Sequence, residues 1–252
     1  MPNFAANLTF LFRELPFLDR FEAAAEAGFS GVEVLFPYDD AAGEITRRLS
    51  ANGLAMVLIN APPPNWAGGA RGFAAVPGGS ERFRHDFRRA MRFAEALGAQ
   101  HLHLMAGKAQ GVVARRTFTD NLAWAAAQAP AMSLTIEPIN PTDMPGYFLN
   151  DFDMAAEILD EVDAPNLGLQ FDMYHAAMIT GDGMAVWEAH GHRAHHIQVG
   201  GVPGRQEPKA GEVDYPAFFA RLDAEGYEGW VSGEYNPAGR TADGMGWIAS
   251  AT

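Results

Sequence analysis

The chain has 252 residues, of which 48% are apolar and 19% are charged, with a net charge of −13. This composition supports a folded core, and the acidic balance without a basic stripe argues against nucleic acid as a partner. The absence of cysteine excludes disulfides, thiolate nucleophiles and cysteine-ligated zinc. Any metal must therefore use oxygen and imidazole ligands, which favours Mg²⁺ or Mn²⁺.

Eight short apolar runs alternate with amphipathic stretches along the chain, and each has the length of a strand. Several are apolar without strict alternation, which is typical of strands buried on both faces. The predicted strands are residues 4–9, 32–36, 54–59, 101–105, 133–137, 167–172, 195–199 and 229–235.

Helical patterns lie between these runs, and several end at glycine or before proline. The predicted helices are residues 18–27, 44–51, 80–97, 117–128, 151–162, 183–190 and 215–225. The alternation predicts an α/β protein with one domain, residues 1–252, folded as a single (β/α)8 TIM barrel. The alternative fold is an open, doubly wound parallel sheet. Two long loops rich in glycine and proline, residues 60–79 and 200–212, follow strands three and seven.

Four polar residues close otherwise apolar strands: Glu137, Asp172, Gln198 and Glu234 come from strands five to eight in order. The carboxyl ends of barrel strands converge on one face, so these side chains should meet there. Each alone could equally cap a helix or pair with an arginine. Three carboxylates together repel one another unless a cation joins them, so the set predicts a site for a divalent ion.

Further candidates surround this set. His175, three residues after Asp172, could orient the substrate or bond a ligand carboxylate, or it could be a satisfied histidine at the rim. Arg71, Lys108 and Arg205 lie in loops after strands three, four and seven. Each is a candidate clamp for an anionic group or a solvated loop charge.

Other polar and aromatic residues receive no place in the metal site. His190 and His192 are expected around a helix end, and His195 and His196 at the start of strand seven. Glu33 stays unassigned within strand two. Trp66 either forms a pocket wall or anchors its loop.

The motifs at these positions resemble the hydroxypyruvate isomerase family, within the xylose-isomerase-like barrels. The likeness covers nearly the whole chain and includes FEAAAEAGFSGVEVLFPYD, ALGAQHLHLMAGK, IEPIN, LQFDMYH, HIQV and GWVSGEY. It implies that Glu137 and Glu234 bind the metal and exchange protons, and that Asp172 and Gln198 complete the metal shell. The loops after strands three and seven depart from the family pattern, which bears on substrate identity.

The resemblance implies a metal-dependent isomerase in which one glutamate removes a proton beside a carbonyl and the other returns it to the next carbon, through a cis-enediolate. Hydroxypyruvate would become tartronate semialdehyde, with Arg71 or Arg205 holding the acid group. A 2-oxo-tetronate isomerase or a ketose 3-epimerase could use the same site. A metal-dependent endonuclease and a non-catalytic sugar-binding barrel are further alternatives.

The expected partner is therefore a small anionic hydroxy-carbonyl substrate. Because no basic leader and no apolar run near 20 residues is apparent, we expect no membrane contact and a cytoplasmic location. The sequence leaves a homo-oligomer open.

Overall fold

The strands form a closed parallel barrel in which each strand pairs with its neighbours in sequence and β8 pairs with β1. This computed structural model describes residues 2–61, 71–209 and 211–249. The strands are β1 (Asn3–Asn7), β2 (Gly31–Val34), β3 (Ala55–Asn60), β4 (His101–His103), β5 (Ser133–Ile136), β6 (Leu167–Asp172), β7 (Ala194–Val199) and β8 (Trp230–Gly233). The predicted TIM barrel is confirmed, and the open sheet is wrong.

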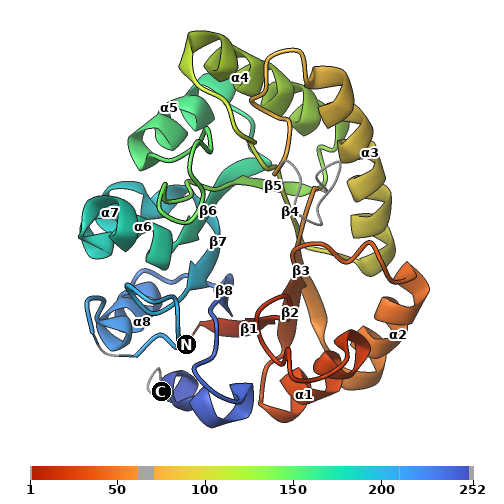
Figure 1. Cartoon of the computed structure of the whole chain (residues 1–252), viewed down its shortest axis with the longest axis vertical. Helices are drawn as coiled ribbons and strands as arrows, with labels where there is room; N and C mark the ends of the chain where they lie inside the picture. Colours follow the sequence, from red (N-terminus) through yellow and green to blue (C-terminus); the bar gives the residue numbers. More distant parts are fainter. Residues whose placement is uncertain (1, 62–70, 210, 250–252) are drawn as a thin grey trace.

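Helices surround the barrel on its outside (Figure 1). They are α1 (Arg20–Glu26), α2 (Ala42–Asn52), α3 (Ser80–Leu97), α4 (Gly111–Gln128), α5 (Phe152–Val162), α6 (Met173–Thr180), α7 (Gly183–His190), α8 (Tyr215–Ala224) and α9 (Gly246–Ala249), with short 3-10 turns at Phe17–Asp19, Gly191–Arg193 and Thr241–Gly244. In the part of the chain that the structure describes, none of the helices combines the length and apolar character that crossing a bilayer requires.

Three helices depart from the sequence expectation, and the short α9 at the end of the chain is one that was not predicted. The α6 helix was not predicted, because apolar residues lie on all its sides and the segment therefore shows no helical period. The α4 helix begins at Gly111, six residues before the predicted start, and its first turn leaves Val112 and Val113 exposed. Both α6 and α4 follow strand ends, so both help to shape the rim where the strands finish.

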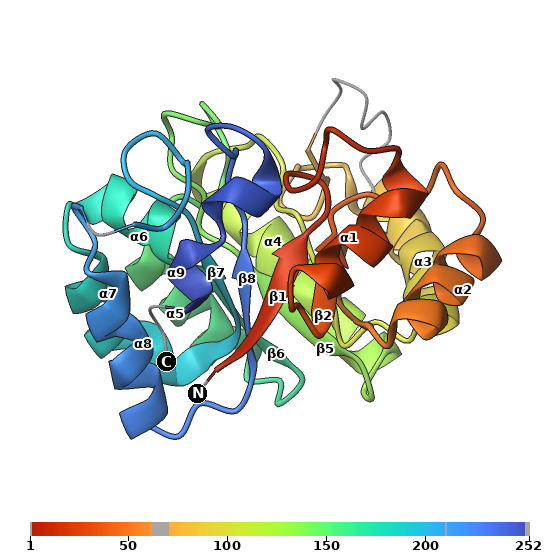
Figure 2. The same cartoon turned by 90° about the horizontal axis from the view of Figure 1, so that it is seen from below.

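The core has two parts. Outward-facing strand residues and the inner faces of the helices form one large apolar cluster, in which Phe21, Phe87, Phe171 and Phe218 are fully buried. Inside the barrel lies a small second cluster of Ala5, Val57 and Leu58. Most of the remaining barrel interior is polar, which is unusual because buried polar groups need hydrogen-bond partners. The strands run toward the upper edge of Figure 2, where long loops cover their carboxyl ends.

Candidate active site

The carboxyl ends of β5 to β8 bring the four predicted residues to one face of the barrel. Glu137 directly follows β5, Glu234 directly follows β8, and Asp172 and Gln198 lie at or next to the ends of β6 and β7. All four are buried, with at most 5% of their surface exposed. Gln198 donates its amide N–H to Glu234, so these two side chains are in direct contact.

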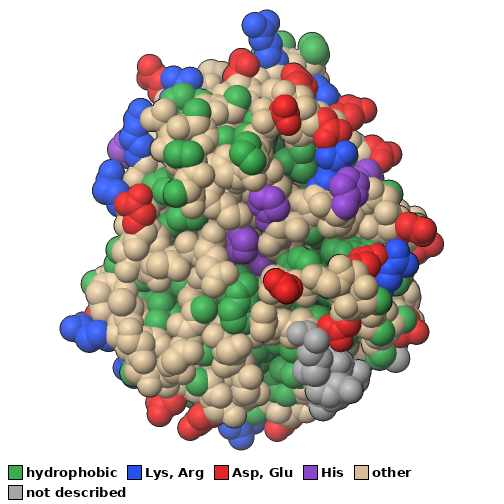
Figure 3. Space-filling view, turned by 180° about the vertical axis from the view of Figure 1, so that it is seen from behind, with side chains coloured by type: hydrophobic (Ala, Val, Ile, Leu, Met, Phe, Trp, Pro, Cys, Tyr) green, Lys and Arg blue, Asp and Glu red, His purple; other side chains and the backbone are tan. Residues whose placement is uncertain are grey.

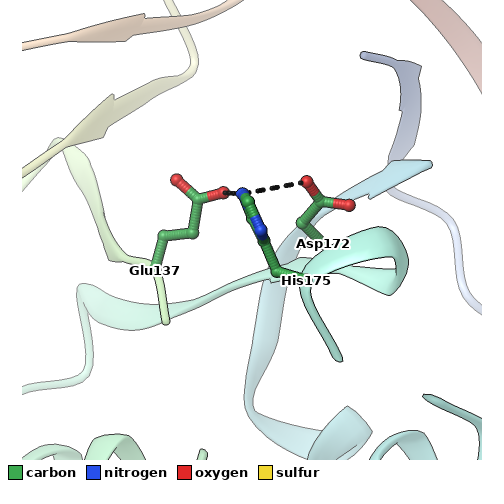
Figure 4. Close-up of side chains that lie close together, drawn as sticks. All are labelled: Glu137, Asp172 and His175. Carbon is green, nitrogen blue, oxygen red and sulfur yellow. Dashed lines mark ion pairs between the residues drawn. The ribbon is translucent and has the colours of Figure 1, made fainter. Parts of the chain in front are cut away.

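Glu137 and Asp172 converge on the imidazole of His175 (Figure 4). Its Nε2 lies 3.7 Å from Glu137 Oε1 and 3.6 Å from Asp172 Oδ2. One ligand atom from each of the three residues lies within 4.8 Å of the others, and all three are buried. The two carboxylates of this cluster could hold a divalent metal ion.

Hydrogen bonds show which nitrogen of His175 carries its proton. The Asn140 side-chain oxygen accepts from the backbone N–H of Asp143 at 2.9 Å, so its amide nitrogen must face His175 Nδ1, 2.8 Å away. Nδ1 therefore accepts, and the proton of the neutral ring sits on Nε2. Burial, with help from Arg205 and His103, holds the pKa of His175 well below its usual value, so the ring is neutral. His175 thus offers an N–H donor to the site.

Arg205, from the loop after β7, supplies the positive charge. Its Nη2 lies 3.2 Å from Asp172 Oδ2 and 2.5 Å from Glu234 Oε1. The guanidinium also stacks between the rings of Phe10 and Tyr174, 5.2 and 4.9 Å from their centroids. Arg205 has a φ of 48°, in the left-handed region, and such strain in a residue other than glycine typically marks a functional position.

The carboxylates outnumber this single cation. Burial raises the pKa of Asp172 and of Glu234 to about 7, although Arg205 acts in the opposite direction on both. The pKa of Glu137 is raised well above its usual value by burial and then by Glu234 and Asp172. Burial lowers the pKa of Arg205, but the surrounding carboxylates raise it by more than burial lowers it. The guanidinium therefore stays charged. The site is therefore poised to accept further positive charge or protons.

This donor set fits a hard divalent ion. Three buried carboxylates face one another with one guanidinium between them, and oxygen ligands are those that Mg²⁺ and Mn²⁺ prefer. Glu137, Asp172 and Glu234 would hold such an ion, in competition with the guanidinium of Arg205, whose Nη2 bridges Asp172 and Glu234.

A second ring of polar side chains lies beneath these residues, and the sequence analysis did not identify it. Glu137, Asp172, Gln198 and Glu234 each have a polar residue two positions earlier, on the same face of the strand. That period-two spacing was the available signal for the inward-facing set, which comprises Thr135, Gln170, His196 and Ser232, with Asn7, Glu33 and His103 on other strands. Gln170 donates to Glu137 Oε2 at 3.1 Å and to Gln198 Oε1 at 2.7 Å.

The predicted ligand role of Gln198 stays a prediction. Its oxygen accepts from Gln170 and its NH₂ group faces Glu33 and Glu234. The orientation is self-consistent, because a carboxylate can only accept hydrogen bonds from an amide nitrogen. Only the second lone pair of the oxygen is left for a cation.

A cavity of about 210 Å³ opens beside the carboxylates. Its described walls are apolar at Phe10, Leu35, Met105, Ile139 and Met144, and polar at Asn60, Arg71, Glu137, Asp143, His175, Arg205 and Glu234. Of the three predicted clamps, Arg71 and Arg205 therefore line it, and Arg71 is braced over the ring of Phe36, 5.6 Å from its centroid.

Two other sequence predictions concern Lys108 and Trp66. Lys108 is exposed and is not among the described lining residues. Trp66 lies outside the described residues.

The fold and this site define a class: a closed barrel with paired buried carboxylates and a small anion-sized cavity at the carboxyl ends of its strands. The sequence profile of the xylose isomerase-like TIM barrel family matches residues 21–251. The chain belongs to this family.

Named relatives narrow the activity to isomerisation. A 2-oxo-tetronate isomerase of Cupriavidus necator is 47% identical, over 98% of both chains. A hydroxypyruvate isomerase of Escherichia coli is 37% identical, again over 98% of both. The chain is an isomerase of this family. Among solved structures, a protein of Brucella melitensis titled AP endonuclease, family 2, is 44% identical over 99% of this chain and 98% of that one, with a TM-score of 0.95.

Proposed function

We propose that this isomerase moves a proton between neighbouring carbons of a small 2-keto-3-hydroxy acid, with hydroxypyruvate as the leading substrate. The observation that carries the proposal is that Glu137 and Glu234 line one cavity, together with His175 and Arg205. Two carboxylates whose pKa values are raised by burial can exchange protons near neutral pH, the condition for general acid–base catalysis.

The proton movements follow from these positions. One glutamate takes the proton from the hydroxyl-bearing carbon, and the electron pair moves to form an enediolate. The other glutamate, protonated, gives its proton to the former carbonyl carbon, while the hydroxyl proton passes from one oxygen to the other. His175 Nε2–H is placed to donate to an oxygen that gains charge. Arg205 and Arg71 would hold the acid group.

A divalent ion, Mg²⁺ or Mn²⁺, would be held by Glu137, Asp172 and Glu234 with Gln198 as a fourth candidate, and would supply Lewis-acid polarisation of the substrate oxygens. Arg205 pairs with Asp172 and Glu234 and also lines the cavity. We infer that it would bind the substrate anion when these two carboxylates hold the ion.

The cavity discriminates among the alternatives. Two arginines line it. A guanidinium pairs with a carboxylate, so their presence favours a short acid over a free ketose, and hence an isomerase over a ketose 3-epimerase or a sugar-binding barrel. A four-carbon 2-oxo-tetronate is the second candidate, supported by the 47% identity to the Cupriavidus necator enzyme.

The test is turnover of both acids, followed by NMR in deuterated water with Mg²⁺, Mn²⁺ or a chelator. We expect metal-dependent conversion, with solvent deuterium incorporated at the receiving carbon because the proton passes through a carboxylate. The larger kcat/KM identifies the preferred acid. No turnover of either acid with any ion would contradict the proposal.

The endonuclease alternative predicts binding to abasic DNA at low salt, and we expect none because the chain is acidic.

A further inference from the structure

Glu33, on β2, is fully buried inside the barrel and lies beneath the proposed site. Its carboxylate meets donors from two other strands. Oε1 accepts from Asn7 Nδ2 of β1 and from Gln198 Nε2 of β7, both at 2.7 Å. Oε2 lies 2.7 Å from Nε2 of His196 on β7, which is also fully buried. Glu33 also has side-chain hydrogen bonds to Ser232 and to Glu234 itself. Its carboxyl group therefore joins side chains of three other strands.

The two amides that bond Glu33 also bond Glu234. Asn7 Nδ2 donates to Glu234 Oε2 at 2.8 Å, and Gln198 Nε2 donates to the same oxygen. Each NH₂ group therefore gives one N–H to Glu33 and the other to Glu234. The opposite ends of the amides are held as well, since Asn7 Oδ1 accepts from the backbone of Thr9 at 3.0 Å and Gln198 Oε1 accepts from Gln170.

This arrangement decides which oxygen of Glu234 is exposed to chemistry. Oε2 is occupied by two N–H donors, whereas Oε1 faces Arg205 at the cavity. If Glu33 could not accept, each amide would keep an unpaired buried N–H and would gain by rotating away from this geometry. The oxygen that Glu234 presents would then no longer be specified.

We propose that Glu33 is a positioning residue: by accepting one N–H each from Asn7 and Gln198, it locks both amides onto Glu234 Oε2, so that Glu234 presents Oε1 alone to the cavity. This inference rests on the proposed function insofar as Glu234 exchanges protons or binds the ion. Its geometric core, the pair of amides held between Glu33 and Glu234, does not depend on that function.

The test compares Glu33→Met with Glu33→Gln. Methionine fills the space but accepts no strong hydrogen bond, so we expect kcat and Mn²⁺ affinity to fall by about 10–100-fold, with KM within about threefold. Glutamine can still accept both N–H groups with its oxygen. Its new NH₂ can donate to His196 Nε2 if that ring moves its proton to Nδ1, which has no partner in the structure. We therefore expect Glu33→Gln to stay within about fivefold of wild type.

Ser133→Ala serves as the matched control, because Ser133 also points into the barrel but bonds only His101 and His195 among the described residues. It should lower the melting temperature and leave kcat and Mn²⁺ affinity unchanged. A folded Glu33→Met protein with wild-type kcat and Mn²⁺ affinity would overturn the inference. So would a Glu33→Gln protein as impaired as Glu33→Met, because charge would then matter in place of hydrogen-bond geometry.

Two arrangements keep the test decisive. If Glu33→Met does not fold, Asn7→Ala removes one of the two locking amides, and we expect kcat to fall by about 3–10-fold; wild-type kcat would refute the lock. If the wild-type protein isomerises none of the acids, the proposed function fails separately. The Glu33 inference is then decided by Mn²⁺ calorimetry and by the side-chain NH₂ signals of Asn7 and Gln198 in metal-free ¹⁵N spectra. These signals should shift and lose protection in Glu33→Met but not in Ser133→Ala.

Discussion

The two ends of the barrel interior are both buried and both rich in titratable groups, yet they are organised differently. At the carboxyl end, Glu137, Asp172 and Glu234 have raised pKa values and share one guanidinium. At the amino end, the hydroxyl of Ser133 lies 2.9 Å from His101 Nδ1 and 3.1 Å from His195 Nδ1. Figure 3 shows histidine side chains near the middle of the face opposite to that of Figure 1.

The difference separates a reactive end from a structural one. Ser133 can donate to one imidazole and accept from the other, so this hydroxyl and its two histidines form neutral hydrogen bonds at the amino end. The carboxyl end holds more negative charge than its own residues balance, and it borders a cavity. Unbalanced buried charge beside an open space is where binding and catalysis are expected. The proposed chemistry therefore belongs to one end alone.

The largest expected effect comes from neutralising the carboxyl end. Glu137→Gln or Glu234→Gln should lower kcat by about 10²–10⁴-fold, because an amide cannot exchange the substrate proton. Initial rates on the better acid at saturating Mn²⁺ measure this. If either variant keeps full activity with intact fold, the acid–base pair is wrong.

Arg205→Met should split metal binding from substrate binding. Removing Nη2 from between Asp172 and Glu234 eliminates a competing cation, so Mn²⁺ should bind several-fold more tightly by calorimetry. KM should rise about 10–100-fold, since a charge-assisted bond to the substrate acid contributes roughly 1.5–3 kcal/mol. Arg193→Met is the control, because Arg193 pairs with Asp160 on the protein surface. Weaker Mn²⁺ binding in Arg205→Met would show that the guanidinium does not compete with the ion.

The histidines at the amino end should make the free energy of unfolding depend on pH in the acid range. Burial lowers the pKa of His101 from 6.5 to about 3, so between these values the unfolded chain binds the proton and the folded protein does not. This contribution is present above pH 6.5 and is lost as the pH falls, by at most about 1.4 kcal/mol per pH unit. Urea unfolding at several pH values should therefore show a steeper acid loss in wild type than in His101→Gln. The carboxylates contribute with the opposite sign, but equally in both proteins. Parallel curves would mean that His101 titrates normally.

The smallest effect on catalysis should come from Ser133→Ala. Two imidazoles lose their shared partner, so the free energy of unfolding should fall by about 1–3 kcal/mol. Isomerase activity per folded molecule should not change. A loss of kcat without a loss of stability would connect the two ends and remove the contrast between them.

Much of the fold was predictable because strands that are buried on both faces appear in the sequence as short apolar runs. Apolar runs of strand length separated by amphipathic stretches indicated eight parallel strands, and each predicted run overlaps an observed one. The α6 helix was not predicted, because a helix that is apolar on all sides shows no hydrophobic periodicity in its sequence. The start of α4 was predicted too late, because the exposed Val112 and Val113 match neither the pattern of a core-facing helix nor that of a helix cap.

The site divides in the same way. The sequence alone determined which residues end the strands, and since parallel strands in a barrel end on one face, it determined that Glu137, Asp172, Gln198 and Glu234 would meet. Only the tertiary structure decided their partners: Arg205 between two carboxylates, and Glu33 beneath Glu234 through Asn7 and Gln198. The physical reason is that strand position depends on local pattern, whereas hydrogen bonds inside a closed barrel join residues more than 200 positions apart, such as Asn7 and Glu234. No local pattern records such a pairing.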